Sequence, residues 1–275
     1  MSNSPAIRLN KFLAERLGVS RREADAIIAS GQITIDGQPA VTGAKVDKFS
    51  KVCYNGKTVP FEADHLYLAF NKPVGYVCSR RAQGAAPTLY ELLPVKYQKL
   101  KTVGRLDKDS SGLILLTNDG DFAFQMTHPK FRKNKVYEVE LDQPLQPLHQ
   151  QMISDFGVQL DDGLSKFTIM KNKAELPSRF VVAREEAGIS LSRGFRSAAA
   201  RELAPAARGF RTAGRDPRKM VSRPLYIVIL TEGRNRQIRR TFAALGYKVT
   251  KLHRVQFGKY ELGNLKPGKC VIIEP

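Results

Sequence analysis

One carboxylate is set apart in the segment VGRLDKDSSGLILLTNDGD, residues 103–121 of a strongly basic chain. Asp107 follows a Gly-Arg-Leu tripeptide and precedes an apolar run, so a cation lies beside it in the sequence. A turn aspartate before a strand usually caps or closes the turn. Here Gly104 and the stretch 109–112 predict a tight loop on each side, and such loops commonly carry functional groups. The carboxylate of Asp107 could therefore close a turn or stand at the mouth of a cleft.

A second segment, TEGRNRQIRRTFAALGYKV at residues 231–249, offers a cationic partner. Asn235 is a candidate N-cap, and Gly246 is a candidate end, for a helix over residues 236–245. Its apolar stripe would be Ile238, Phe242 and Leu245, and away from that stripe would lie Arg236, Arg239 and Arg240. These arginines could form a solvated or phosphate-facing surface. One of them could instead pair with Asp107 through both guanidinium prongs and keep the carboxylate ionised.

The charge balance indicates a polyanionic partner. Lys and Arg number 45 against 26 Asp and Glu, and a net charge of +19 favours nucleic acid through counterion release. A solvated basic surface without a specific partner is the alternative. The sequence has no signal-peptide pattern and no apolar run near the ~20 residues that a bilayer-spanning helix needs. We therefore expect a cytoplasmic, monomeric protein with no membrane partner.

Metal and disulfide chemistry are not indicated. Three scattered cysteines, an odd number, suit a reducing cytosol and predict no disulfide framework. The four histidines form no HxxxH spacing and no CxxC motif is present, so we expect no structural metal.

Residues 1–60 predict two helices followed by a small ribbon. Apolar residues recur at helical spacing over residues 7–17. In SRREADAIIASG, Ser20 and Glu23 have capping-box spacing, and Gly31 can take the left-handed position that ends a helix. Two hairpin signals follow, Asp-Gly at 36–37 and Asn-Gly at 55–56.

Residues 61–65 are expected to be a linker, and a strand-rich part follows over residues 66–275. We expect strands at 66–73, 113–117, 136–141, 179–183, 225–230, 247–252 and 270–274. Helical patterns intervene at 147–156 and 236–245. Because strands and helices mix without a regular βαβ rhythm, the pattern predicts an α+β fold on a mostly antiparallel mixed sheet.

The helix-helix-ribbon pattern resembles the S-four RNA-binding domain, which is named after a ribosomal small-subunit protein. The resemblance implies that the two helices present basic residues to an RNA backbone. The residues at those positions are Arg8, Lys11, Arg21 and Arg22, with Lys45 as a further candidate. Ordinary solvated helix faces are the alternative for each of them.

The larger part resembles a family of RNA-modifying enzymes. GRLDKDSSGLILLTNDG, the KVY tripeptide at 135–137, EGRNRQIRR followed by KLHR, and LAFNKPVGYVCS occur in the order of the pseudouridine synthases of the ribosomal small subunit pseudouridine synthase A type. That branch also includes large-subunit rRNA enzymes. Each tetrapeptide alone is weak, and their combination is specific.

The resemblance implies roles for individual residues. Asp107 matches the catalytic aspartate, Tyr137 the tyrosine that stacks on the target base, and Arg239 the arginine paired with the aspartate. Arg105 matches a position that helps to hold the target nucleotide out of its helix, and Leu252 an apolar residue near the base. Arg236 is expected among the substrate-binding residues. Without the resemblance, Tyr137 would be a half-buried strand aromatic and Leu252 a core leucine.

The implied reaction is isomerisation of a specific uridine in ribosomal RNA to pseudouridine, with no cofactor and no metal. The segments LAFNKPVGYVCS and KFRKNKVYEVEL slightly favour small-subunit over large-subunit rRNA. Attack of the carboxylate on the sugar and a glycal-type route both stay open. The rival from another class is a non-catalytic RNA-binding or ribosome-assembly factor on the same fold. A glycoside hydrolase would need two carboxylates with separate roles, and neither Asp109 nor Asp119 has an obvious acid environment.

Two features depart from the family pattern. A basic insertion at about 184–223 carries the tetrapeptide RGFR twice, at 193–196 and 208–211. It could contact RNA through charge and stacking, or it could be a mobile surface insertion. Thr241 stands where an apolar residue is expected, which leaves the local packing open.

Overall fold

The computed structural model describes residues 6–62, 64–80, 84–171 and 224–275. The chain forms two compact units. The first consists of Met1–Tyr137, Ile229–Arg236 and Leu252–Pro275, and the second of Glu138–Val228 and Gln237–Lys251. The expected strand at 179–183 and the expected insertion at 184–223 lie outside the described residues. Among the described helices, none has the length and apolar character that crossing a bilayer requires.

The N-terminal module contains both expected helices. Helix α1 spans Leu9–Arg16 and helix α2 spans Arg21–Ala29. The capping box at the start of α2 is confirmed, because the Glu23 amide donates to Ser20 Oγ over 3.2 Å and the Ser20 amide donates to Glu23 Oε2 over 2.7 Å. Gly31 has a φ of +74°, as expected for the residue that ends this helix.

The ribbon of the module is also confirmed. Strands β2 (Ile33–Ile35), β3 (Gln38–Pro39), β5 (Val52–Tyr54) and β6 (Lys57–Thr58) form an antiparallel sheet in the order β3-β2-β5-β6. Both two-residue turns have two consecutive positive φ values, as the Asp-Gly and Asn-Gly signals predict. Two further short strands, β1 (Ile7–Arg8) and β4 (Lys45–Val46), pair with each other.

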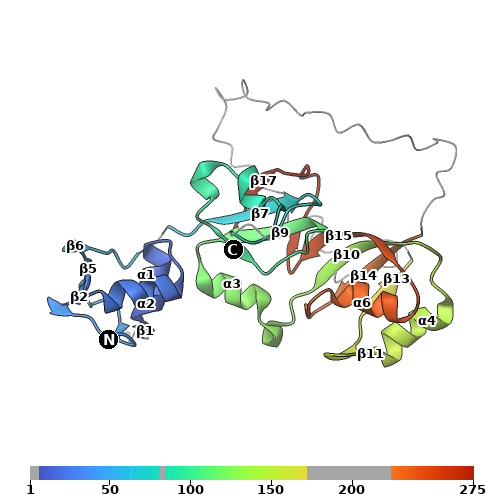
Figure 1. The fold of residues 1–275 in the computed structure, drawn as a ribbon, viewed down its shortest axis with the longest axis horizontal. Helices are drawn as coiled ribbons and strands as arrows, with labels where there is room; N and C mark the ends of the chain where they lie inside the picture. Colours follow the sequence, from blue (N-terminus) through green and yellow to red (C-terminus); the bar gives the residue numbers. More distant parts are fainter. Residues whose placement is uncertain (1–5, 63, 81–83, 172–223) are drawn as a thin grey trace, which may run out of the picture. The chain divides into compact units, whose positions relative to one another are not determined.

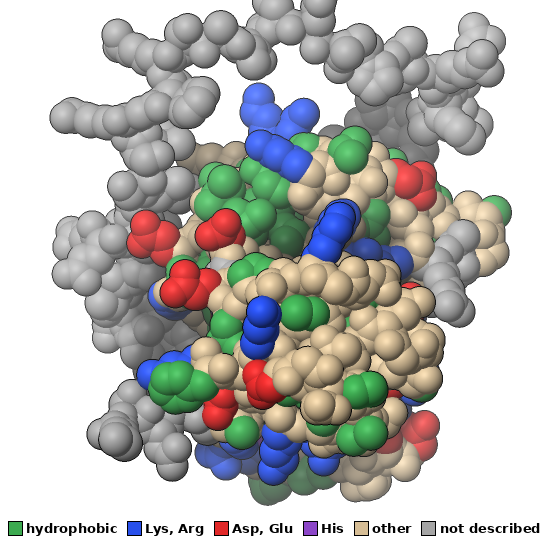
Figure 2. All heavy atoms as spheres, turned by 90° about the vertical axis from the view of Figure 1, so that its left-hand side faces the viewer, with side chains coloured by type: hydrophobic (Ala, Val, Ile, Leu, Met, Phe, Trp, Pro, Cys, Tyr) green, Lys and Arg blue, Asp and Glu red, His purple; other side chains and the backbone are tan. Residues whose placement is uncertain are grey.

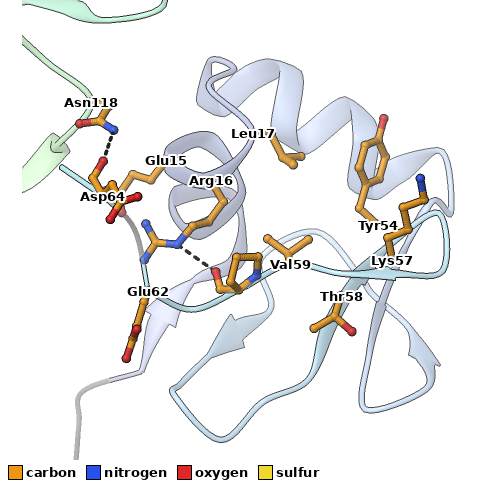
Figure 3. A pocket seen from close by; sticks show the side chains of 11 residues that line it. Glu15, Arg16, Leu17, Tyr54, Lys57, Thr58, Val59, Glu62, Asp64 and Asn118 are labelled. Atoms are coloured by element: carbon orange, nitrogen blue, oxygen red, sulfur yellow. Dashed lines mark hydrogen bonds between the residues drawn. The ribbon is translucent and has the colours of Figure 1, made fainter. Parts of the chain in front are cut away.

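Side chains hydrogen-bond to the backbone of the segment that follows the ribbon, at residues 60–62 and 64–66 (Figure 3). The guanidinium of Arg16 donates to the carbonyl oxygens of Pro60, over 3.2 Å, and Phe61. Asn118 holds the other end, donating to the Asp64 carbonyl over 2.9 Å and accepting from the Leu66 amide over 2.8 Å. A cavity of about 350 Å³ lies among these residues. Backbone groups of this connection are thus paired rather than left to water.

The remaining strands build one mixed sheet (Figure 1), in the order β13-β14-β10-β15-β9-β7-β17 with β8 and β16 at its side. Their bounds are β7 Tyr67–Lys72, β8 Lys101–Val103, β9 Ser111–Thr117, β10 Lys135–Leu141, β13 Thr168–Met170, β14 Leu225–Leu230, β15 Val249–Phe257, β16 Tyr260–Glu261 and β17 Cys270–Ile272. Strand β9 pairs antiparallel with β7 and β8 but parallel with β15. The expected α+β fold on a mostly antiparallel sheet is confirmed.

In the first unit, the sheet packs against a helix that sequence reasoning missed. Helix α3 (Gly120–Thr127) is capped by Asp119, whose Oδ1 accepts from the amides of Asp121 and Phe122 over 2.8 and 3.1 Å. Its buried side chains Phe122 and Met126 belong to the core that also contains Val103, Leu113, Leu115 and Phe257. Three 3-10 helices, Leu89–Leu92, Val95–Tyr97 and Pro129–Phe131, complete this unit.

The second unit contains both other helical patterns. The expected helix at 147–156 is α4 (Pro147–Gln151), continued as one π-helical turn over Met152–Phe156. Helix α6 spans Gln237–Ala244, and Gly246 follows it with a φ of +84°. Strands β11 (Val158–Leu160) and β12 (Gly163–Ser165) form a hairpin.

Thr241 is fully buried in the second unit and has polar partners. Its Oγ1 donates to the Gln237 carbonyl over 2.9 Å and lies 2.7 Å from Ser165 Oγ, which also accepts from the Gln237 side chain over 3.1 Å. The hydroxyl thus joins a buried hydrogen-bonded group, which explains why a polar residue is tolerated at this position.

Gly112 allows two strands to approach each other closely. It lies opposite Lys72 on β7 and opposite Arg254 on β15. A Cβ atom at residue 112 would lie 2.6 Å from the Arg254 amide nitrogen and still closer to the Arg254 carbonyl oxygen. The φ of Gly112 is also +105°, a value that residues with a side chain rarely adopt.

We expect Gly112→Ala to lower the free energy of unfolding by more than about 4 kcal/mol, because the new methyl group would force β9 and β15 apart. Gly268→Ala is the matched control, since Gly268 shares a positive φ of +76° but has no neighbouring atom within 4 Å. The control should lose only about 1–2 kcal/mol from its backbone conformation. Urea unfolding of both variants would measure the difference, and equal losses would contradict the steric explanation.

Candidate functional site

Asp107 lies in the loop between β8 and β9. Its backbone carbonyl closes the turn by accepting from the Ser110 amide over 3.1 Å. Gly104, three residues earlier, has a φ of +71°, which bends the chain as the sequence predicts. The Asp107 side chain is 33 % exposed. The backbone therefore makes the turn and the carboxylate stays accessible, so the turn and a reactive role are compatible.

A buried lysine holds this loop from the core side. Lys72, at the end of β7, is fully buried, and its Nζ donates to the carbonyl oxygens of Pro73, Asp107 and Ser110 over 3.0, 3.1 and 2.7 Å. Three acceptors satisfy all three protons of an ammonium group. Burial lowers the pKa of Lys72, while the neighbouring Cys78, Asp107 and Asp109 act in the opposite direction. Sequence reasoning quoted this lysine within LAFNKPVGYVCS but assigned it no role.

Cys78 fixes the residue before the aspartate. Its Sγ accepts from the Leu106 amide over 3.4 Å and donates to the Leu106 carbonyl over 3.3 Å. Burial raises the pKa of Cys78, so the neutral thiol, which can donate, is favoured. The backbone on the N-terminal side of Asp107 is thus held by a side chain about 30 residues away in the sequence.

Arg236 is the arginine of the second segment that the first unit brings to the Asp107 loop. Its Nη1 and Nη2 donate to Oδ1 and Oδ2 of Asp109, each over 3.0 Å, and its Nη1 lies 3.9 Å from Asp107 Oδ2. The hydrogen bonds that Arg236 donates to Asp109 raise the pKa of Arg236. The helix begins one residue later than expected, because Arg236 itself has a left-handed φ of +46°.

The other two candidate arginines, Arg239 and Arg240, belong to the second unit. Arg239 is part of α6, and its Nη1 donates to the Val249 carbonyl over 2.9 Å. Arg240 binds the acidic pair Asp161 and Asp162. The pairing of Arg239 with Asp107 stays a prediction.

Tyr137 and Leu252, which the resemblance implies are near the target base, are both largely buried, with exposed fractions of 8 % and 7 %. Arg254 lies beneath Tyr137, with its guanidinium carbon 6.0 Å from the ring centroid, and donates from Nε to the Leu113 carbonyl over 2.7 Å. Arg254 is 2 % exposed and is the arginine of the quoted KLHR tetrapeptide, yet sequence reasoning gave it no role. Arg105 is exposed beside the loop.

Asp119, the other carboxylate that a hydrolase might use, is occupied as the cap of α3. Burial pushes its pKa upward, but hydrogen bonds from the Phe122 amide, the Tyr67 hydroxyl and the Asp121 amide outweigh this and lower the pKa of Asp119. A general acid needs a raised pKa, so this group is unsuited to that role.

The basic residues expected to contact RNA differ in their surroundings. Arg8, Arg21 and Arg22 are exposed, whereas Lys11 Nζ lies 2.6 Å from Asp121 Oδ1. Figure 2, viewed from the side where Figure 1 draws the N-terminal module, shows Lys and Arg side chains at several separate places with acidic side chains between them. RNA binding by these residues stays a prediction.

The comparisons with known proteins can be set beside this geometry. The family model described as RNA pseudouridylate synthase matches residues 66–244, and the S4 domain model matches residues 7–48. The chain belongs to the RNA pseudouridylate synthase family. Both resemblances noted in the sequence are confirmed, and the pseudouridine synthase family makes this chain an isomerase.

Relatives of this pseudouridine synthase cover nearly its whole length. The ribosomal small subunit pseudouridine synthase A of Pasteurella multocida is 32 % identical over 93 % of this chain and 90 % of its own. The ribosomal large subunit pseudouridine synthase B of Pseudomonas aeruginosa is 29 % identical over 91 % of this chain and 55 % of its own. A solved structure described as a pseudouridylate synthase shares the fold, with a TM-score of 0.57, 24 % identity, and coverage of 98 % of this chain and 96 % of its own.

Lys135, in the KVY element of this pseudouridine synthase, is a second partly buried lysine. Its Nζ donates to the Glu232 carbonyl over 3.3 Å and lies 5.4 Å from the Phe257 ring centroid. Burial, followed by repulsion from Arg254, lowers the pKa of Lys135 to about 8. In the unfolded chain a lysine titrates near pH ~10.4, so between these values the unfolded state binds more protons than the folded state.

We therefore expect the cost of burying the Lys135 charge to be fully present below pH 8 and to disappear as the pH rises to about 10. Stability should rise over this range more steeply in the wild type than in Lys135→Met, by less than about 1.4 kcal/mol per pH unit because solvent screens this partly exposed group. Urea unfolding at pH 7 to 10 would measure the two slopes, with the exposed Lys57→Met as the matched control. Parallel curves for the wild type and Lys135→Met would contradict this expectation.

Proposed function

We propose that this protein isomerises a uridine of ribosomal RNA to pseudouridine and that Asp107 is the catalytic carboxylate. The observation that carries the proposal is the placement of Asp107 in the GRLD loop. Its carboxylate is partly exposed, its backbone is fixed by the buried Lys72, and the Arg236 guanidinium lies 3.9 Å away.

The chemistry of the reaction suits a single ionised carboxylate. The C–N glycosidic bond of uridine breaks, the uracil turns, and a C–C bond forms between the same sugar and the same base, so that all atoms are retained. A carboxylate can attack the sugar or remove a proton from it, and neither route needs a redox partner. Both routes stay open for Asp107.

The remaining site residues complete the proposal. Tyr137 stacks on the target base, Arg239 pairs with Asp107, and Leu252 packs near the base. Arg105 holds the displaced nucleotide, and Arg236 contributes to substrate binding. Extrusion of a base from a duplex costs a few kcal/mol, and stacking with phosphate contacts can offset that cost.

We propose small-subunit rRNA as the substrate, bound by an N-terminal domain over residues 1–60 and modified by a catalytic domain over residues 66–275. The net charge of +19 supports an RNA partner. The S4 domain match and the relative named for the small ribosomal subunit, which is covered along most of its length, support the choice of RNA. Arg8, Lys11, Arg21 and Arg22 are the proposed backbone contacts of the module.

Asp107→Asn tests the catalytic role. The amide is nearly isosteric with the carboxylate but cannot act as nucleophile or base, so we expect at least a ~10³-fold loss of the single-turnover rate. Pseudouridine formation in transcribed rRNA would measure this loss. RNA affinity, measured alongside, should change by less than about 3-fold, because Asp107 is one of many polar groups that would face the RNA.

Asp155→Asn is the matched control for that loss, because Asp155 is exposed on the π-helical turn of the second unit. It should keep the wild-type rate. Isomerisation by Asp107→Asn at more than about a tenth of the wild-type rate would refute the catalytic role and favour an RNA-binding factor on the same fold.

The choice of rRNA has its own test. In cells that lack this protein we expect one pseudouridine to disappear from small-subunit rRNA and to return when the wild-type gene, but not Asp107→Asn, is restored. Nucleotide-resolution mapping of both ribosomal RNAs would identify the site. Disappearance of a pseudouridine from large-subunit rRNA alone would overturn the small-subunit assignment and leave the isomerase activity in place.

A further inference from the structure

An arginine lies between two carboxylates of the same loop. Arg236 donates through both of its terminal nitrogens to Asp109, each over 3.0 Å, while its nearest approach to Asp107 is 3.9 Å. Asp107 and Asp109 are two residues apart in the sequence, and both belong to the GRLDKDSSG segment. The guanidinium therefore has two carboxylates nearby and is hydrogen-bonded to Asp109.

The Nη1–Nη2 edge of a guanidinium can hold one carboxylate at a time, and in this structure it holds Asp109. If this edge were on Asp107, both of its oxygens would accept charge-assisted hydrogen bonds, which makes a carboxylate a weaker nucleophile and a weaker base. Arg239, the expected partner of Asp107, would then have to share the same two carboxylate oxygens. Because Asp109 occupies this edge, the Asp107 oxygens lie outside hydrogen-bonding distance of it, with Oδ2 3.9 Å from Nη1.

The backbone at Arg236 supports a directed side chain. Its φ of +46° is left-handed, a conformation that side-chain-bearing residues adopt at a cost. Such a conformation persists only where the surrounding structure holds it, and such residues concentrate at functional sites. The two hydrogen bonds to Asp109 anchor the Arg236 side chain. The Asp109 carboxylate is 46 % exposed, so the pair itself adds little to folding stability.

We propose that Asp109 is a positioning residue for the isomerisation: it holds the Arg236 fork and thereby keeps the Asp107 carboxylate available to react. The inference rests on the proposed function of Asp107. Asp109 does not touch the reacting atoms in this role. It acts through Arg236, by competing with Asp107 for the same guanidinium.

The competition predicts an unusual pattern of rates. In Asp109→Asn, Arg236 should move onto Asp107, and the single-turnover rate at saturating rRNA should fall about 10- to 100-fold with less than about a 3-fold change in KM. Adding Arg236→Gln to this variant removes the misplaced fork. The double variant should therefore react at least about 5-fold faster than Asp109→Asn alone, a rescue that a merely structural pair would not show.

Two further variants complete the experiment. Asp109→Glu keeps a carboxylate that can hold the fork and should retain the rate within about 5-fold of wild type. Asp162→Asn removes a partner of Arg240, an arginine–aspartate contact that belongs to the second unit, and should leave the rate unchanged. Urea unfolding of every variant would show that each is folded.

The outcomes separate this inference from the proposed function. A double variant no faster than Asp109→Asn, or Asp109→Glu as slow as Asp109→Asn, would overturn the positioning role while leaving Asp107 as the catalytic group. An active Asp107→Asn measured in the same series would overturn the proposed function and the positioning role with it. Rescue in the double variant, with Asp107→Asn inactive, would establish both.

Discussion

A buried ammonium group organises the loop on which the candidate site depends. Lys72 places its charge inside the first unit, where a charge is costly to bury, and offsets that cost with three backbone carbonyl acceptors. Two of these acceptors, Asp107 and Ser110, belong to the loop that presents the carboxylate. Lys72 therefore ties the end of β7 to this loop, and the backbone that carries the Asp107 side chain is held from the core.

The close approach of the backbones reinforces this arrangement. Gly112 lets the start of β9 lie against Arg254 of β15, and the buried Arg254 reaches the Leu113 carbonyl and the underside of Tyr137. The start of β9, which directly follows the Asp107 loop, and Tyr137 on β10 therefore contact the same arginine. In the proposed reaction Asp107 and Tyr137 would act on one nucleotide, and a rigid support near both would serve that chemistry.

Local signals were sufficient for the local elements. The capping box of Ser20, the two-residue turns of the ribbon and the left-handed Gly246 depend on residues adjacent in sequence, and each was confirmed. Helix α3 was missed although Asp119 is a good cap, because the helix is short and spans only Gly120–Thr127. The role of Lys72 was missed because the sequence of an apolar strand does not indicate which carbonyl oxygens its lysine will bind. Two of the three acceptors lie in a loop about 35 residues away.

The sequence by itself determined the fold class and the family, because these depend on motifs, periodicity and turn residues that are local or ordered along the chain. It left three arginines as candidates for a contact with the Asp107 loop. Only the tertiary structure decided that Arg236 reaches this loop and that its fork lies on Asp109. The physical reason is that a contact between residues 127 positions apart depends on the folded geometry, in which Arg236 Nη1 lies 3.0 Å from Asp109 Oδ1 and 3.9 Å from Asp107 Oδ2.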